Sequence, residues 1–143
     1  MIASGTLHKI QGYIDNVIND DIVVCDLVRK AVQRHVRDLE REGDKDFPYY
    51  FDSQHAEVAV DFIESLLCHS IGEHAGLPLI LEPWQAFGVA CLFGWKRADD
   101  STRRFRKAYW SMGRKNGKST LGAALAVLLA SFDVNPGTGK PEA

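Results

Sequence analysis

The chain has 143 residues, a net charge of -2, and hydrophobic and charged fractions of 45% and 25%, which together predict one soluble globular domain. No apolar run reaches the roughly 18 residues that a membrane-spanning helix needs, and the N-terminus lacks the apolar core of a signal peptide. The cysteines are three in number and far apart, which argues against a disulfide framework and predicts reduced thiols in a cytoplasmic protein.

Apolar residues recur at every third or fourth position in three segments of the N-terminal half, which predicts three helices, and a strongly apolar run predicts a fourth. They are expected over residues 6–19, 22–42, 53–69 and 83–94. Gly43 ends the second helix and Pro83 suits the first turn of the fourth. His35 lies on the apolar face of the second helix, so we expect a core or boundary histidine. Residues 44–52 and 96–104 are predicted as loops, the latter polar and basic.

The period changes after residue 104. The run FRKAYWSM (105–112) is predicted as a buried strand because apolar residues occupy both of its faces. The run KSTLGAALAVLLASF (118–132) is small and apolar nearly all round, which predicts a helix packed tightly against a sheet. The tail after Asp133 is rich in Pro and Gly and is predicted to be flexible.

The run SMGRKNGKST (111–120) lies between the predicted strand and helix, and it ends like the phosphate-binding pattern G-x-x-x-x-G-K-[ST]. Met112 occupies the place of the first glycine, and Gly113 follows one residue late. In this context backbone N–H groups of the loop and the first helical turn converge on an anion. Gly117 permits close approach of the backbone to the ligand.

The residues after Gly117 have the chemistry of a nucleotide site. Lys118 is expected between the β- and γ-phosphates, Ser119 on Mg²⁺, and Thr120 at the α-phosphate. Arg114 lies where a guanidinium could stabilise charge during phosphoryl transfer, although Arg114 and Lys115 could instead face solvent or DNA.

Two further features bear on ligand binding. Trp84 and Gln85 offer a stacking face and an amide that suit adenine, with helix packing as the alternative. Residues 96–118 carry nine basic and two acidic side chains, a local field that attracts phosphate. A solvated basic turn is the alternative for that segment. Cys68, His69 and His74 match no common zinc spacing, so no metal site is predicted there.

Several motifs occur together in a fixed order. The runs LEPWQAFGVACLFGWKR (81–97) and TRRFRKAYWSMGRKNGKST (102–120) contain P-W-Q, G-W and R-R-F-R segments and a loop ending in R-K-N-G-K-S. This combination resembles the start of the ATPase domain of large terminase subunits from tailed bacteriophages, the motors that package DNA. The runs YIDNVIND, VRKAVQRHVRDLER and YYFD resemble the leader of that family, so the resemblance covers about residues 10–131.

The resemblance implies ATP and Mg²⁺ as cofactors, with Gln85 at the adenine, Ser119 at the metal, and Arg114 and Lys118 as catalytic residues. The expected nucleotide-binding set also includes the rest of the loop: Gly113, Lys115, Asn116, Gly117 and Thr120. Relatives often have a small apolar residue and Pro where this chain has Met112 and Gly113, which affects the entry of the loop. The implied partners are double-stranded DNA, a small terminase subunit, a portal protein and further copies of the motor, in the host cell cytoplasm and away from membranes.

The expected fold is α/β and mostly helical. Residues 1–80 form a helical leader region, 81–133 the first strand, Walker A loop and helix of an incomplete P-loop ATPase domain, and 134–143 a flexible tail. The acids after Lys118 are Asp133 and Glu142, and Asp133 is expected about 20 Å along the helix from Ser119. Neither a second acidic motif nor a nuclease domain is recognisable, so we expect the N-terminal part of a larger protein without turnover of its own. The alternatives are a non-catalytic helical module that binds DNA or a partner protein through residues 96–118, and an inert truncated prophage product.

Overall fold

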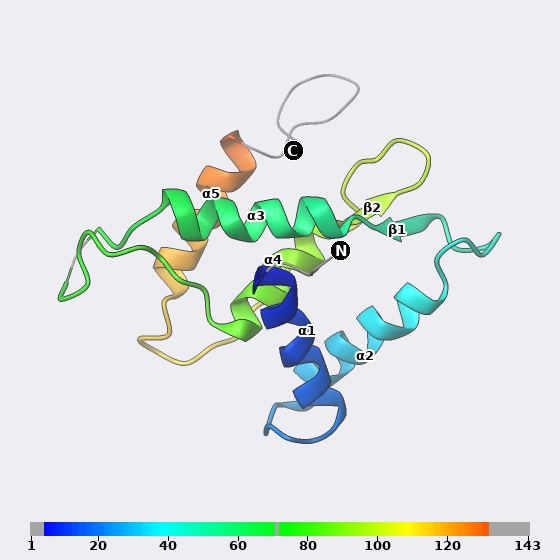
Figure 1. Ribbon diagram of the computed structural model, residues 1–143, viewed down its shortest axis with the longest axis horizontal. Helices are drawn as coiled ribbons and strands as arrows, with labels where there is room; N and C mark the ends of the chain where they lie inside the picture. The colour runs from blue at the N-terminus through cyan, green and yellow to red at the C-terminus, as the bar shows by residue number, and fades with distance from the viewer. Residues whose placement is uncertain (1–4, 71, 132–143) are drawn as a thin grey trace.

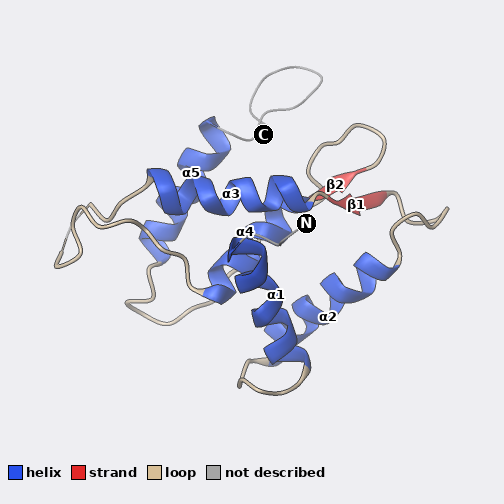
Figure 2. Cartoon of the chain, viewed as in Figure 1, coloured by secondary structure: helices blue, strands red, loops and turns tan. Residues whose placement is uncertain are grey.

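The computed structural model describes residues 5–70 and 72–131. Within this part the chain is mostly helical, with one small sheet at one end of the molecule (Figures 1 and 2). The elements are α1 (Gly5–Ile18), α2 (Asp26–Glu40), β1 (Tyr49–Phe51), α3 (Ser53–Leu66), α4 (Pro83–Gly94), β2 (Trp95–Arg97) and α5 (Lys118–Ser131). No helix in this part is long and apolar enough to cross a membrane. The predicted flexible tail and Asp133 lie outside the described residues.

Helix α4 lies at the centre of the fold, in contact with α1 and α3 (Figure 1). Its start is set by Pro83 and by a capping box, in which Glu82 and Gln85 each accept the other's backbone N–H. No face of α4 is polar, and the buried residues occur all round it: Ala86, Phe87, Val89, Ala90, Phe93 and Gly94. A helix of this composition is stable only when other elements surround it.

The amphipathic helices α1 and α3 supply most of that surround. Their buried stripes are Ile10, Tyr13, Ile14 and Val17 in α1, and Ala56, Ala59, Val60 and Ile63 in α3. Two polar contacts join the helices beside the core: Lys9 Nζ lies 2.5 Å from Glu64 Oε1, and the Thr6 hydroxyl donates to Asp61. The four predicted helices are thus all present, although α2 is shorter at both ends than the period suggested.

The small sheet was not predicted. Strands β1 and β2 run antiparallel, with Tyr49 opposite Arg97 and Phe51 opposite Trp95. Both segments had been assigned to loops because a three-residue strand is too short to display a period of two. The packing of α3 on α4 brings the two strands together, since the Asp52 N–H at the start of α3 donates to the Gly94 carbonyl at 2.8 Å.

The strand predicted over residues 105–112 is wrong. This segment belongs to no strand and makes no backbone-to-backbone hydrogen bond within the described residues. Trp110 packs on α4 instead, since a Cβ added at Gly88 would lie 2.6 Å from its ring, whereas the neighbouring Tyr109 is 86% exposed. A strand requires a neighbour for its N–H and C=O groups, and the described part offers none here.

Helix α5 begins at Lys118 as predicted, but the expectation that a sheet covers it is also wrong for the described residues. It contacts α3, and only one stripe is buried, formed by Leu121, Ala124 and Leu128. Val127 on another face is 41% exposed.

The predicted polar loop 96–104 is largely structural. Arg104 Nη1 lies 2.8 Å from Asp38 Oδ2 of α2, and the Asp38 side chain is only 4% exposed. The guanidinium of Arg104 lies 4.5–5.2 Å from four ring centroids, those of Phe47, Tyr49, Trp95 and Phe105. Arg103 is buried too and donates to the Phe105 carbonyl. Arg104 therefore links α2 to the sheet, through Asp38 on one side and Tyr49 and Trp95 on the other.

His35 is a core residue, as the sequence predicted. Its Nδ1 accepts a hydrogen bond of 3.0 Å from the indole Nε1–H of Trp95. Burial lowers the pKa of His35 from 6.5 to about 4, which the nearby Asp38 opposes in part. The ring is therefore neutral at physiological pH and keeps an acceptor for the tryptophan.

We predict that Gly94→Ala destabilises the protein. The new Cβ would lie 2.5 Å from Phe51 and 2.9 Å from Ala56, so the free energy of unfolding should fall by about 1–3 kcal/mol through overpacking. Gly12→Ala is the control, since Gly12 lies inside α1 with no atom within 4 Å of the added Cβ, and it should gain about 0.5–1 kcal/mol. Urea denaturation measures both, and equal responses would contradict the close contact between α4 and β1.

Arg104→Ala should lower the free energy of unfolding by about 3–5 kcal/mol, because it leaves Asp38 buried without its ion-pair partner. Arg106→Ala removes an exposed charge two residues away and should change it by less than about 0.5 kcal/mol. Denaturation of both variants side by side tests the structural role, which similar losses would refute.

The depressed pKa of His35 predicts a pH dependence of stability. The unfolded chain takes up a proton near pH 6.5, whereas the folded protein does so only near pH 4. The contribution is therefore complete above about pH 6.5, is lost as the pH falls toward about 4, and amounts to about 3 kcal/mol at most. His35→Gln lacks this titration, so denaturation curves at pH 7 and 4.5 should differ less for the variant than for the parent protein. Parallel pH profiles would rule the effect out.

Candidate functional site

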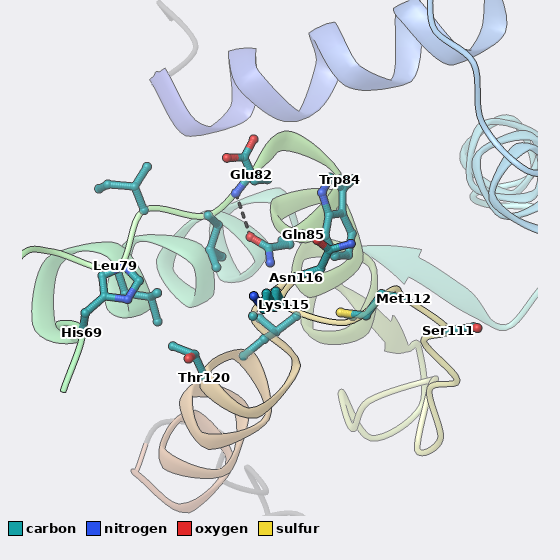
Figure 3. A pocket seen from close by; sticks show the side chains of 14 residues that line it. His69, Leu79, Glu82, Trp84, Gln85, Ser111, Met112, Lys115, Asn116 and Thr120 are labelled. Atoms are coloured by element: carbon teal, nitrogen blue, oxygen red, sulfur yellow. Dashed lines mark hydrogen bonds between the residues drawn. The ribbon is translucent and has the colours of Figure 1, made fainter. Parts of the chain in front are cut away.

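A cavity of about 660 Å³ lies between the N-terminal end of α4 and the loop that precedes α5 (Figure 3). Two segments far apart in the sequence form most of its wall: the connector between α3 and α4, and residues 111–121. The lining residues are His69, Leu79, Ile80, Leu81, Glu82, Trp84, Gln85, Ser111, Met112, Lys115, Asn116, Gly117, Thr120 and Leu121.

The loop before α5 contains two residues with positive φ, one of them Gly117. Gly117 has φ 72° and Lys115 has φ 65°, both in the left-handed region. Helix α5 follows at once, and the Leu121 N–H in its first turn donates to the Gly117 carbonyl at 2.8 Å. The N–H groups of the first turn have no partner within a helix, so this end carries partial positive charge beside the cavity.

The cavity unites some of the predicted site residues and not others. Gln85, Lys115, Asn116, Gly117 and Thr120 line it. The others stand next to them in the chain but do not line it: Gly113, Arg114, Lys118 and Ser119. Neighbouring residues of the loop thus differ in whether they face the cavity, and the sequence pattern did not distinguish them.

Lys118 is engaged within its own loop. Its Nζ donates to the Met112 carbonyl at 3.2 Å, which closes the loop across its two ends. The side chain is exposed, so a stronger anionic acceptor could draw the ammonium away from this carbonyl.

Gln85 connects the start of α4 to the loop. Its Oε1 accepts the Glu82 N–H at 2.9 Å, which fixes the orientation of the amide. Its Nε2 lies 3.8 Å from the place where a Cβ on Gly117 would stand. The amide therefore presents hydrogen-bond donors on the side of the cavity that faces the loop.

Sequence reasoning missed the connector. On sequence grounds His69 is considered only as a metal ligand, and residues 79–81 have no assigned role. The Leu79 N–H donates to the Leu67 carbonyl at 2.9 Å, and this brings the end of the connector back beside its start. No local pattern could have predicted that return. The rings of His69 and His74 lie 5.8 Å apart, and the described residues contain no cluster of three or more His, Cys, Asp or Glu that could hold a metal.

The charges around the cavity favour an anionic ligand. Among the described lining residues Glu82 is the one acid, and its side chain already accepts the Gln85 backbone N–H. Lys115 lines the cavity, and Arg114 and Lys118 are exposed on the same loop. A helix N-terminus with three nearby cations can bind phosphate.

Comparison with known proteins identifies this segment. Residues 83–140 match the family described as terminase large subunit, ATPase domain. No curated protein and no solved structure matches the chain significantly. The match includes the start of α4, the loop and α5, so it confirms the resemblance that the sequence motifs carried. Over residues 83–140, the chain is similar to the ATPase domain of terminase large subunits.

Proposed function

We propose that this chain binds ATP with Mg²⁺ in the cavity between α4 and the loop before α5, as the nucleotide-binding part of a DNA-packaging motor. One observation carries the proposal: the segment that matches a terminase ATPase domain also supplies both Gln85 and the loop, and the fold places them against one another. Residues 81–133 would be the start of the ATPase domain and residues 1–80 its helical leader.

The triphosphate would occupy the loop side of the cavity. Backbone N–H groups of the first turn of α5 would bind phosphate oxygens, aided by Gly113 and Asn116 in the loop. Lys118 would exchange the Met112 carbonyl for the β- and γ-phosphates, and Ser119 would bind Mg²⁺ through its hydroxyl. Thr120 would lie at the α-phosphate, and Gln85 would donate to the adenine.

Arg114 and Lys118 are the residues we propose for phosphoryl transfer. Arg114 is exposed on the loop, from which a long guanidinium side chain can reach a γ-phosphate and stabilise its charge. Hydrolysis also needs a carboxylate that orients the attacking water. Glu82, the one acid among the described lining residues, is occupied in the capping box. We therefore propose nucleotide binding, and assign no general base.

As part of a packaging motor, the chain would act on double-stranded DNA in the host cell cytoplasm, with a small terminase subunit, a portal protein and further copies of itself. The alternative of a DNA-binding module at residues 96–118 loses part of its support, because Arg103 and Arg104 have structural roles. The exposed cations that remain available for phosphate are Arg106, Lys107, Arg114, Lys115 and Lys118.

Lys118→Ala should weaken the binding of Mg²⁺–ATP by about ten- to a hundredfold, the range expected for loss of a charge-assisted contact. Isothermal titration calorimetry measures the dissociation constant directly. Lys45→Ala, at an exposed site between α2 and β1, is the matched control and should leave it unchanged. If Lys118→Ala binds as tightly as the parent protein, or if the parent does not bind Mg²⁺–ATP, the proposed function fails.

A further inference from the structure

The loop residues indicate in which orientation a nucleotide would lie in the cavity. Lys118 Nζ lies at the Met112 carbonyl, which marks the end where the β- and γ-phosphates would sit. Thr120, the third residue of α5, also lines the cavity, and Figure 3 shows it on the far side of Lys115 from Met112. A nucleoside triphosphate bound along the loop therefore passes from Met112 to Thr120, and its base lies beyond Thr120.

The wall beyond Thr120 is formed by the connector between α3 and α4. Figure 3 shows His69 and Leu79 together on the side of Thr120, whereas Trp84 and Met112 lie on the opposite side, with Gln85 and Lys115 between. Trp84 is thus at the phosphate end, although its ring had suggested a stacking face for the base.

His69 is held firmly for a connector residue. Its N–H donates to the Leu77 carbonyl at 3.0 Å, and its own carbonyl accepts the Gly76 N–H at 2.8 Å. The adjacent Cys68 forms a β-bridge with Pro78. The ring is partly exposed into the cavity and stands beside the buried Leu79, so a planar aromatic face adjoins an apolar surface.

We propose that the imidazole of His69 is the stacking platform for the base of a purine nucleotide, with Leu79 as the apolar floor beside it. This inference rests on the proposed function, and it adds a residue that lies outside the segment matched by the family, residues 83–140. An aromatic ring against a base stabilises binding through its π-face and apolar area. Stacking accepts adenine and guanine alike, so His69 contributes affinity for a purine while the donors of Gln85 contact its edge.

The test compares two ligands that share phosphates but not a base: Mg²⁺–ATP and Mg²⁺–tripolyphosphate, each titrated calorimetrically. His69→Ala should weaken ATP binding by about tenfold and leave tripolyphosphate unchanged, because only ATP has a base to stack. His69→Phe keeps an aromatic face and should retain most of the affinity for ATP. His74→Ala removes the neighbouring ring and should alter neither ligand, and Lys118→Ala should weaken both.

Each other result overturns a specific statement. ATP binding that is unchanged in His69→Ala, while Lys118→Ala weakens both ligands, would refute the role of His69 and leave the proposed function standing. An equal loss for tripolyphosphate would assign His69 to the phosphates and refute stacking. If neither ligand binds the parent protein, the proposed function fails and this inference with it. Circular dichroism of each variant confirms that a loss of affinity is not a loss of fold.

Discussion

The burial of helix α4 is the constraint on which the rest of the structure depends. Its apolar residues leave no face for water, so α1 and α3 must cover it, and burial of each large side chain contributes about 1.5–3 kcal/mol. Both ends of α4 also position other parts of the structure. Its N-terminal turn presents Gln85 to the cavity, and its C-terminal end continues directly into β2. Packing of Trp110 on Gly88 also fixes the segment that leads to the loop.

The basic stretch 96–118 has two functions within one run of sequence. Its first half stabilises the fold: Arg104 pairs with Asp38 among four aromatic rings, and Arg103 is buried beside it. Its second half leaves Arg114, Lys115 and Lys118 next to a helix N-terminus. The difference arises because an arginine can lose water only where a carboxylate, carbonyl or ring replaces it, and Arg103 and Arg104 meet the Asp38 carboxylate, the Phe105 carbonyl and several aromatic rings.

The candidate site has two parts: a loop whose shape depends on neighbouring residues, and an opposite wall whose position depends on packing between distant segments. The loop needs only neighbouring residues: left-handed backbone at Lys115 and Gly117, followed by a helix with free N–H groups. The wall opposite needs the whole core, since the connector reaches the loop only because α3 packs on α4 and the chain folds back at Leu79. A cavity that accommodates both phosphates and a base requires the two together.

The sequence alone determined the helices, the start of α5 at Lys118, the core position of His35 and the similarity of residues 83–140 to a terminase ATPase domain, because periodicity, capping and motifs are local properties. Tertiary structure decided the rest. It packed Trp110 of the expected strand on α4, formed a sheet from strands too short to detect, buried Arg103 and paired Arg104 with Asp38. It also placed His69 and Thr120 in the wall of one cavity. These outcomes depend on contacts between segments that are distant in the sequence, and the spacing of residues along the chain does not reveal such contacts.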